Sequence, residues 1–321
     1  MPVELAAGVL KDRLDTLTAR EAKRFAAGRP KAKAALSSGA SAWLDGVPMH
    51  WMKDWPMPHL PVITKAKGAR ITDLDGFEID DFCLGDTGSM FGHSPAPVAK
   101  AIRKQASRGL TYMLPPESVT EVGDLLTARF GNFRWQIATT ASDANRFAIR
   151  VARAITARPK ILVFNGCYHG AVDETMVELE NGKTQTRAGL LGQINDLSQT
   201  AVCVEFNDLA AVEAALAIGD VAAILTEPVM TNCSMVLPAA GFHDGLRSLS
   251  RRFGTLLIMD ETHTISSGLG GYTAVHSLSP DMFVVGKCVA GGLPTAVWGM
   301  TPEIAQRYQV ADAARPPGHS G

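Results

Sequence analysis

From Trp135 onward the sequence alternates between short apolar runs and stretches with helical periodicity. The apolar runs have the length of buried strands, and they are WQIATT, KILVFNG, TAVCVEF, VAAILTEPV, TLLIMDE, MFVVGK and TAVWGM. Amphipathic helical patterns over 142–156, 209–218 and 242–253 lie between several of these runs. This alternation predicts an α/β domain with a mainly parallel sheet and flanking helices.

The first part of the chain lacks this alternation. Apolar residues at helical spacing predict a helix over 9–27, whereas residues 40–66 are rich in Trp, Met, Pro and His and have no period. We therefore expect a helical and irregular segment over 1–67 and one large domain over 68–321. A hairpin over 69–82, with its turn at Asp75-Gly76, would open that domain.

Charge and composition exclude several classes of protein. The chain has 31 Lys and Arg, 32 Asp and Glu and a net charge of −1, so no nucleic-acid partner is expected. No apolar run approaches the roughly 18 residues of a membrane span, so no membrane association is expected either. The five cysteines form no CxxC pair, which favours free thiols in a reducing cytosol over disulfides or zinc. Because the N-terminus also lacks a signal-peptide pattern, we expect a cytoplasmic protein.

Ligands of open α/β sheets bind at the carboxyl ends of the strands. Four strand ends carry polar or charged residues here: Thr139 to Ser142, Glu227, Asp260 and Lys287. Lys287 is the most informative, because it follows the apolar run MFVV and one glycine. An amine withdrawn from water favours its neutral, nucleophilic form, which a Schiff-base lysine requires. A lysine that packs its stem and reaches water with its head is the alternative.

The other strand ends fit parts of a single ligand. Ser142 would cap the helix over 142–156, whose first N–H groups would cradle a phosphate, unless the serine is a plain N-cap. Asp260 ends the apolar run LLIM, where it would accept a hydrogen bond from a cationic ring N–H or pair with an arginine. Tyr168 would stack on a flat ring or pack at a rim. Together these residues fit a ligand that has a phosphate, a flat ring with a ring nitrogen, and a carbonyl that reacts with an amine. Pyridoxal phosphate (PLP) has all of these groups. No metal is expected, because ETHT lacks a partner histidine at ligand spacing.

From about Gly68 to Met300 the sequence resembles the class III aminotransferases, a PLP-dependent family that includes ω-aminotransferases and glutamate-1-semialdehyde aminomutases. The blocks that carry the resemblance are GARITDLDGFEIDDF, GHSPAPVAKAI, TTASDAN through YHG, LTEPV, LLIMDETHT and SPDMFVVGKCVAGGLPTAVWG, in this order. The resemblance implies the type I fold of the aspartate aminotransferases, PLP as cofactor, and a homodimer with its active sites at the interface.

The resemblance also implies roles for the residues at the strand ends. Lys287 would hold the cofactor as a Schiff base and then move a proton as general acid and base. Asp260 would keep the pyridine nitrogen protonated, and Ala141 and Ser142 would bind the phosphate. Tyr168 would stack on the ring.

Further cofactor contacts follow from the same comparison. His169 would lie beside the stacking tyrosine and Glu227 close to the ring. Thr262 would face the other side of the ring, and His263 would contact the ring hydroxyl, where relatives commonly have a glutamine. Thr140-Ala141-Ser142-Asp143 replaces the family's Ser-Gly-Thr-Glu, and the alanine would be strained only if its position needed a positive φ.

Two departures from the family concern the substrate pocket, for which Trp55 and Asp86 are the candidate residues. Asp86 stands where relatives tend to place an aromatic residue, and an acid there would disfavour a substrate carboxylate. No arginine lies between Arg29 and Arg70, so the carboxylate-binding arginine of the aminomutases has no counterpart. Both departures favour an aminotransferase that moves an amino group from an amine or an ω- or β-amino compound to a keto acid such as pyruvate.

Two alternatives remain open, an aminomutase of the glutamate-1-semialdehyde type and a non-catalytic binding protein with a PLP fold. The second would need a damaged site, whereas Lys287, Asp260, Tyr168 and Ser142 are all present. The resemblance further implies a small C-terminal domain of on the order of a hundred residues, which this sequence does not contain.

Overall fold

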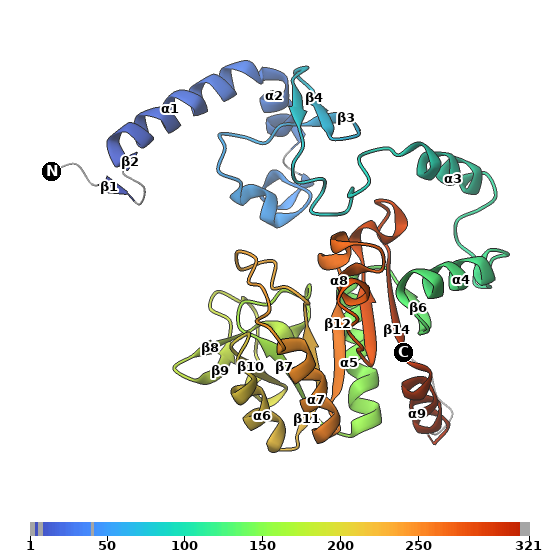
Figure 1. Ribbon diagram of the computed structural model, residues 1–321. Coiled ribbons are helices and arrows are strands. Elements are labelled where there is room, and N and C mark those ends of the chain that lie inside the picture. Colours follow the sequence, from blue (N-terminus) through green and yellow to red (C-terminus); the bar gives the residue numbers. More distant parts are fainter. Residues whose placement is uncertain (1–3, 6–8, 40–41, 315–321) are drawn as a thin grey trace. The chain divides into compact units, whose positions relative to one another are not determined.

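The computed structural model describes residues 4–5, 9–39 and 42–314, and the chain divides into two compact units. The first unit comprises Met1–Leu84 and Phe91–Lys104, and the second comprises Gly85–Met90 and Gln105–Gly321. Figure 1 shows both units coloured along the sequence. The hairpin over 69–82 belongs to the first unit, whereas the sequence pattern predicts that it opens the large domain.

A seven-stranded sheet forms the centre of the second unit. Its strand order is β10-β7-β11-β12-β13-β14-β6. The bounds are β6 Arg134–Ala138, β7 Lys160–Phe164, β10 Ala201–Val204, β11 Val221–Thr226, β12 Leu256–Asp260, β13 Met282–Val285 and β14 Ala296–Met300. The first five strands in this order run parallel, and β14 runs antiparallel to both of its neighbours. The predicted α/β fold with a mainly parallel sheet is confirmed.

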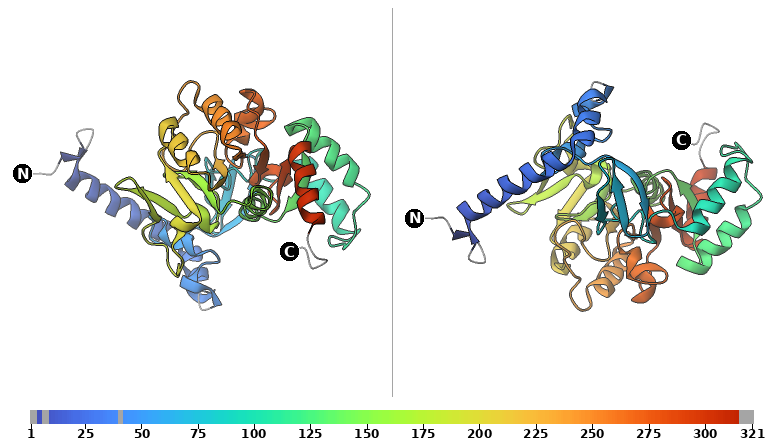
Figure 2. Two further views of the ribbon diagram at one scale, coloured as in Figure 1. Left: turned by 90° about the horizontal axis from the view of Figure 1, so that it is seen from below. Right: turned by 90° about the horizontal axis from the view of Figure 1, so that it is seen from above.

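Helices cover the sheet (Figures 1 and 2), and three of them lie where helical spacing predicted them. The helices of this unit are α4 Val119–Phe130, α5 Ala141–Thr156, α6 Leu209–Ala217, α7 Phe242–Phe253, α8 Gly271–Val275 and α9 Pro302–Ala313. Helix α5 packs on β11, β13 and β14, while α7 packs on β12 and against α6. Ala144, Ala148 and Ala152 repeat every four residues on α5 and are fully buried, so small side chains allow the helix to approach the sheet closely.

The strands next to the site are buried on both faces, as expected for parallel strands between layers of helices. Every residue of β11, β12, β13 and β14 is buried. Phe283 of β13 packs with Phe133 and Trp135 in a smaller apolar cluster beside the main core. Burial of a large apolar side chain contributes about 1.5–3 kcal/mol. The strand ends that carry the polar residues are therefore held by a dense core.

The second unit also contains short elements that the apolar pattern did not predict. Strands β8 Val177–Glu180 and β9 Lys183–Thr186 form an antiparallel hairpin with a turn at Asn181-Gly182. The short 3₁₀ helices are η4 Asp173–Thr175, η5 Leu197–Gln199, η6 Thr264–Ser267 and η7 Lys287–Ala290. Among the described residues, no helix has both the length and the apolar character needed to cross a bilayer.

The first unit combines helices with a small sheet. Its elements are β1 Glu4–Leu5, β2 Val9–Leu10, α1 Lys11–Gly28, α2 Pro30–Gly39, η2 Leu44–Gly46, η3 His50–Asp54, β3 Ile63–Lys67, β4 Arg70–Asp73 and β5 Glu78–Asp80, and α3 Ala96–Ala106 begins in it. Strands β4 and β5 form the expected hairpin, and β3 adds a third strand. The ion pair between Arg29 Nε and the buried Asp73 (2.8 Å) ties the end of α1 to this sheet.

Candidate active site

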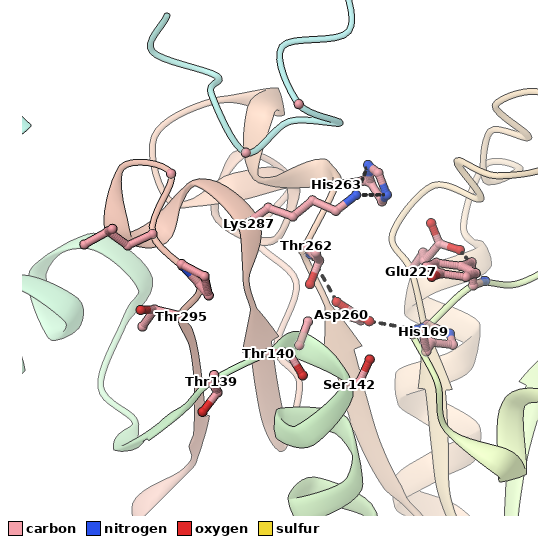
Figure 3. Close-up of a pocket in the computed structure, with 18 residues that line it drawn as sticks. Thr139, Thr140, Ser142, His169, Glu227, Asp260, Thr262, His263, Lys287 and Thr295 are labelled. Atoms are coloured by element: carbon pink, nitrogen blue, oxygen red, sulfur yellow. Dashed lines mark hydrogen bonds and ion pairs between the residues drawn. The ribbon is translucent and has the colours of Figure 1, made fainter. Parts of the chain in front are cut away.

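The carboxyl ends of the parallel strands of the second unit meet around one cavity of about 350 Å³ (Figure 3). Strand β6 runs in the same direction as β13, because β14 is antiparallel to both, so its end joins the others. The lining residues are Gly85, Gly88, Thr139, Thr140, Ala141, Ser142, Tyr168, His169, Gly170, Glu227, Asp260, Thr262, His263, Lys287, Gly292, Leu293, Pro294 and Thr295. A cavity of this volume is in the range of sites for small ligands and cofactors.

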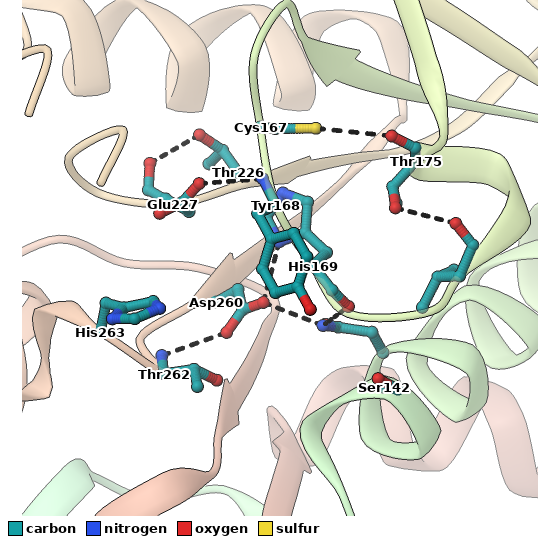
Figure 4. Close-up of polar contacts among 12 residues, drawn as sticks. Ser142, Cys167, Tyr168, His169, Thr175, Thr226, Glu227, Asp260, Thr262 and His263 are labelled. Atoms are coloured by element: carbon teal, nitrogen blue, oxygen red, sulfur yellow. Dashed lines mark hydrogen bonds and ion pairs between the residues drawn. The ribbon is translucent and has the colours of Figure 1, made fainter. Parts of the chain in front are cut away.

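Asp260 is a buried carboxylate of this cavity, and both of its oxygens have hydrogen-bond partners (Figure 4). Its Oδ2 accepts from Asn145 Nδ2 (2.9 Å) and lies 2.8 Å from His169 Nδ1. Its Oδ1 accepts from the backbone N–H of Thr262 (3.1 Å). Three neighbours therefore replace the water that the carboxylate loses on burial.

Asp260 and His169 form a buried ion pair. Burial alone would lower the pKa of His169, but the contacts with Asp260 and Cys167 together outweigh burial and hold this pKa well above its usual value. Burial would likewise raise the pKa of Asp260, yet the contact with His169 keeps it below the usual value. The pair is therefore a carboxylate with an imidazolium. An anion in this position favours the protonated form of a ring nitrogen placed against it.

The start of helix α5 corrects the sequence prediction for Ser142. The N-cap is Thr140, whose Oγ1 accepts from the N–H of Asp143 (3.1 Å) and donates to its side chain (2.8 Å). Ser142 lies inside the helix, where its Oγ accepts from the N–H of Ala171 (3.0 Å). Thr140 takes the cap because it has extended backbone angles, which an N-cap requires.

Helix geometry leaves the first N–H groups of α5 pointing into the cavity. Thr140 satisfies the N–H groups of Asp143 and Ala144, and helix geometry provides no partner for those of Ala141 and Ser142. Ala141 has no positive φ, so the alanine that replaces the family's glycine is not strained. The two N–H groups and the positive end of the helix dipole suit an anion such as a phosphate.

Gly170 makes a close contact with this helix start. It has φ +81°, and a Cβ built on it would lie 2.0 Å from Ser142 Oγ and 3.1 Å from Ser142 Cα. Only glycine fits both the backbone angle and the space. The contact holds the loop of Tyr168 and His169 against α5.

Tyr168 and Glu227 lie next to each other above Asp260 (Figure 4). Glu227 is buried, and its Oε1 accepts from the backbone N–H of Tyr168 (3.2 Å). Its Oε2 accepts from the backbone N–H (3.1 Å) and the hydroxyl (2.6 Å) of Thr231. The carboxylate thus fixes the backbone of Tyr168, whose half-exposed side chain lines the cavity as a stacking residue must.

Lys287 lies directly after β13, at the first residue of η7. Its φ of 53° is in the left-handed region, which few residues other than glycine adopt. Its Nζ donates to Asp86 Oδ2 (2.5 Å) and lies 2.6 Å from His263 Nε2. The side chain is one-fifth exposed, whereas that of Asp86 is 71% exposed. The amine is therefore held at the mouth of the cavity by groups on both sides.

The structure brings most of the predicted residues together. Those that line the cavity are Lys287, Asp260, Tyr168, Ala141, Ser142, His169, Glu227, Thr262 and His263, and Asp86 contacts the lysine amine. Trp55 belongs to the first unit, and its proposed place in a substrate pocket stays a prediction. Sequence reasoning missed Asn145 as a partner of Asp260. A signal was available in the sequence, because Asn145 lies one turn into an amphipathic helix. The structure shows that this amide is fully buried, and a buried amide needs a hydrogen-bond partner.

The residues present fit PLP. The carboxylate of Asp260, the free N–H groups of α5, the side chain of Tyr168 and the Lys287 amine all face one cavity. The buried hydroxyl oxygen of Thr262 also lines it and has no hydrogen-bond partner in the described structure. A buried polar atom without a partner in such a cavity indicates a ligand that completes it. Within the same described part of the chain, no three His, Cys, Asp or Glu side chains group closely enough to hold a metal ion.

Comparison with known proteins identifies the family of the chain. Residues 52–319 match the model of the family "Aminotransferase class-III". The chain is 32% identical over 276 residues to the glutamate-1-semialdehyde 2,1-aminomutase of Thermoplasma acidophilum, covering 84% of this chain and 65% of that protein. The fold resembles a solved glutamate-1-semialdehyde aminomutase of Pseudomonas aeruginosa with TM-score 0.92 and 50% identity over 96% of this chain and 68% of that one. It also resembles an omega-transaminase of Sphaerobacter thermophilus with TM-score 0.80 and 27% identity over 86% of this chain and 65% of that one.

The fold and the arrangement of the site are those of the PLP-dependent enzymes of fold type I. The chain belongs to the class III aminotransferases, and the predicted family and cofactor are confirmed at this level. The chain spans 58–65% of the length of the three curated aminomutases it matches.

Proposed function

We propose that this protein is an aminotransferase that moves an amino group from an amine or an ω- or β-amino compound to a keto acid such as pyruvate. The observation that carries the proposal is the shared cavity of Lys287 and the buried Asp260–His169 pair. An amine at the mouth and a fixed anion below it are the two groups that PLP chemistry requires from the protein.

Each group has a separate task in this proposal. Bound PLP supplies an electron sink for the carbon that bears the amino group. Asp260, kept anionic by His169, holds a proton on the ring nitrogen. The N–H groups of Ala141 and Ser142 hold the phosphate, and Tyr168 covers one face of the ring. Lys287 would hold the cofactor covalently and, once a substrate amine displaced it, its Nζ would take and return the proton of the substrate carbon as general base and acid.

The charges around the mouth support an amine donor. The carboxylate of Asp86 contacts the amine of Lys287. It would repel a carboxylate group of the substrate. No arginine is among the lining residues of the described cavity, so the bidentate partner that suits a carboxylate is not supplied by this unit. A donor with an amine but no carboxylate at its reacting end would not be repelled by Asp86 and would not need an arginine.

The second candidate is an aminomutase, and the names of the relatives favour it. Three curated relatives and a solved structure are glutamate-1-semialdehyde aminomutases. The same residues would serve internal transfer of an amino group within one substrate. A non-catalytic binding protein is not favoured, because every group that the cofactor requires faces the cavity.

Two further proposals concern the surroundings of the enzyme. We propose a homodimer with active sites at the interface, supported by large apolar side chains of the second unit that are exposed in the single chain, namely Leu110, Met113, Leu114, Leu125 and Ile137. We propose a cytoplasmic location, supported by five cysteines of which none forms a disulfide.

A panel of amine donors tested with pyruvate separates the candidates. The aminotransferase should convert pyruvate to alanine in amounts equal to the donor consumed. An aminomutase would isomerise glutamate-1-semialdehyde with no second substrate, and that result without any alanine would contradict the proposal. A protein that retains no visible absorbance after unbound PLP is removed, and that shows no borohydride-fixed adduct on Lys287, would exclude both.

A further inference from the structure

His263 lies against the amine of Lys287. Its Nε2 is 2.6 Å and its Nδ1 3.4 Å from Lys287 Nζ, and Figure 3 shows the ring at the end of the extended lysine side chain. Asp86 Oδ2 lies 2.5 Å from the same nitrogen. The reacting amine therefore has an imidazole and a carboxylate within hydrogen-bond distance. This contact differs from the ring-hydroxyl contact that the family resemblance implied for His263.

The backbone around His263 fixes the ring in this place. The residue follows β12 by three positions, and Ser266 donates to its carbonyl oxygen from the hydroxyl (3.1 Å). The side chain is 17% exposed. Its Nδ1 lies 3.5 Å from the hydroxyl oxygen of Thr87. Both ring nitrogens thus lie within 3.5 Å of the lysine amine, and Nδ1 also lies near the hydroxyl of Thr87.

The charges that face His263 favour a neutral ring at neutral pH. Burial lowers the pKa of His263, and the positive charge of Lys287 lowers it further. The carboxylates of Asp86, Glu227 and Asp260 act in the opposite direction without reversing the shift. A neutral imidazole offers one lone pair. Of the two ring nitrogens, Nε2 lies nearer to the lysine amine.

The two neighbours of the amine have different chemical abilities. The carboxylate of Asp86 stabilises the ammonium form, although its exposure to water weakens the interaction. An imidazole accepts and releases a proton near neutral pH, which suits a group that works in both directions.

We propose that His263 is the proton carrier of Lys287, a role that rests on the proposed function. As Nζ bonds to the aldehyde carbon of PLP, His263 Nε2 takes two protons from the ammonium, one at a time. It passes each to the aldehyde oxygen, which leaves as water when its bond to carbon breaks. The nitrogen loses two protons, the oxygen gains two, and the imidazole ends neutral. No oxidant or reductant takes part.

The rate of covalent attachment of PLP tests this role without any measurement of turnover. The protein is freed of cofactor, mixed with PLP, and quenched with borohydride at intervals between pH 5 and 9, and the modified Lys287 peptide is quantified by mass spectrometry. His263→Gln keeps a hydrogen-bonding side chain but carries no proton. We expect it to slow attachment by about 100-fold near neutral pH and to remove the part of the pH dependence of the rate that comes from His263.

Two more variants separate proton transfer from positioning. His263→Ala should be equally slow, and added imidazole should restore much of its rate. Asp86→Asn, a change on the other side of the same amine, should attach PLP at least as fast as the wild type, since the ammonium loses its counter-charge. The role would be overturned if His263→Gln attached PLP at the wild-type rate. It would also be overturned if imidazole did not restore the slow attachment of PLP to His263→Ala. Failure of the wild type to attach PLP at Lys287 would instead overturn the proposed function.

Discussion

Two carboxylates of the candidate site, Asp260 in the cavity and Asp86 beside Lys287, each lie against a basic side chain, yet in opposite surroundings. Asp260 is 3% exposed, pairs with a fully buried histidine and has two further hydrogen bonds. Asp86 pairs with Lys287, but its side chain is 71% exposed. The first pair is part of the core and keeps its geometry. The second is held by a contact that water can replace, which suits a lysine that must exchange its partner during a reaction.

The largest expected effect comes from removing the cation of the exposed pair. Lys287→Ala should abolish covalent attachment of PLP and reduce transamination by at least about 10³-fold, because the reacting nitrogen is lost. Borohydride trapping followed by peptide mass measures the first effect and a pyruvate-coupled assay the second. Lys183→Ala, a change of an exposed lysine in β9, is the control and should leave both unchanged. Full turnover by Lys287→Ala would refute the assignment of the site.

The buried pair should dominate stability. Asp260→Ala leaves His169 without its counter-charge in the core and should lower the free energy of unfolding by about 3 kcal/mol or more. Asp86→Ala removes an exposed partner and should change it by less than about 1 kcal/mol. Urea unfolding of the two variants under the same conditions provides the comparison. Equal losses would show that the difference in burial has no energetic consequence.

Gly170→Ala tests how firmly the loop of His169 is held. The new Cβ would overlap Ser142 Oγ, and we expect a loss of about 1–3 kcal/mol together with weaker binding of PLP. Gly182→Ala is a matched control, because Gly182 also has a positive φ (+74°) but nothing within 4 Å of the added atom. The control therefore measures backbone strain alone. Thermal unfolding and PLP titration of both variants separate crowding from strain.

The buried pair should also give stability a particular pH dependence. Burial opposes the charge on His169, but the hydrogen bond to Asp260 raises its pKa in the folded state. The stabilisation from this raised pKa is complete below a pH of about 6.5, which is the pKa of a histidine in the unfolded chain. It is lost as the pH rises through the pKa of His169 in the folded state. Above a pH of about 6.5 the wild type should therefore lose up to about 1.4 kcal/mol per pH unit relative to His169→Gln. Urea unfolding of both proteins across this range checks the slope, and parallel curves would contradict a charged His169.

Much of the site could be predicted because it lies at the ends of apolar strands. Asp260 and Lys287 each follow a run of buried residues, and the topology of a parallel sheet brings such ends together. The capping residue could not be chosen from sequence, since Thr140 and Ser142 are both good caps and only the backbone angles decide between them. The hairpin of β8 and β9 could not be recognised because its strands are short and mostly polar.

The contacts around Lys287 were beyond the reach of sequence patterns. Asp86 is 201 positions away along the chain, and no local period relates it to the lysine. The sequence placed His263 near the cofactor, but its distance from the amine depends on the left-handed backbone of Lys287 and on the turn that follows β12. Such side-chain geometry follows from tertiary packing and from strained backbone, which periodicity does not encode.

The contact between Gly170 and Ser142 also limits how this sequence can change over generations. A side chain at position 170 needs the space of the Ser142 hydroxyl, and a bulkier residue at 142 needs the space beside the Gly170 backbone. Even a glycine at 142 would leave its Cα 3.1 Å from a new Cβ. Position 170 therefore cannot accept a side chain, whichever residue stands at 142. Among descendants of this sequence, we expect glycine at 170 to persist for as long as the loop rests on helix α5.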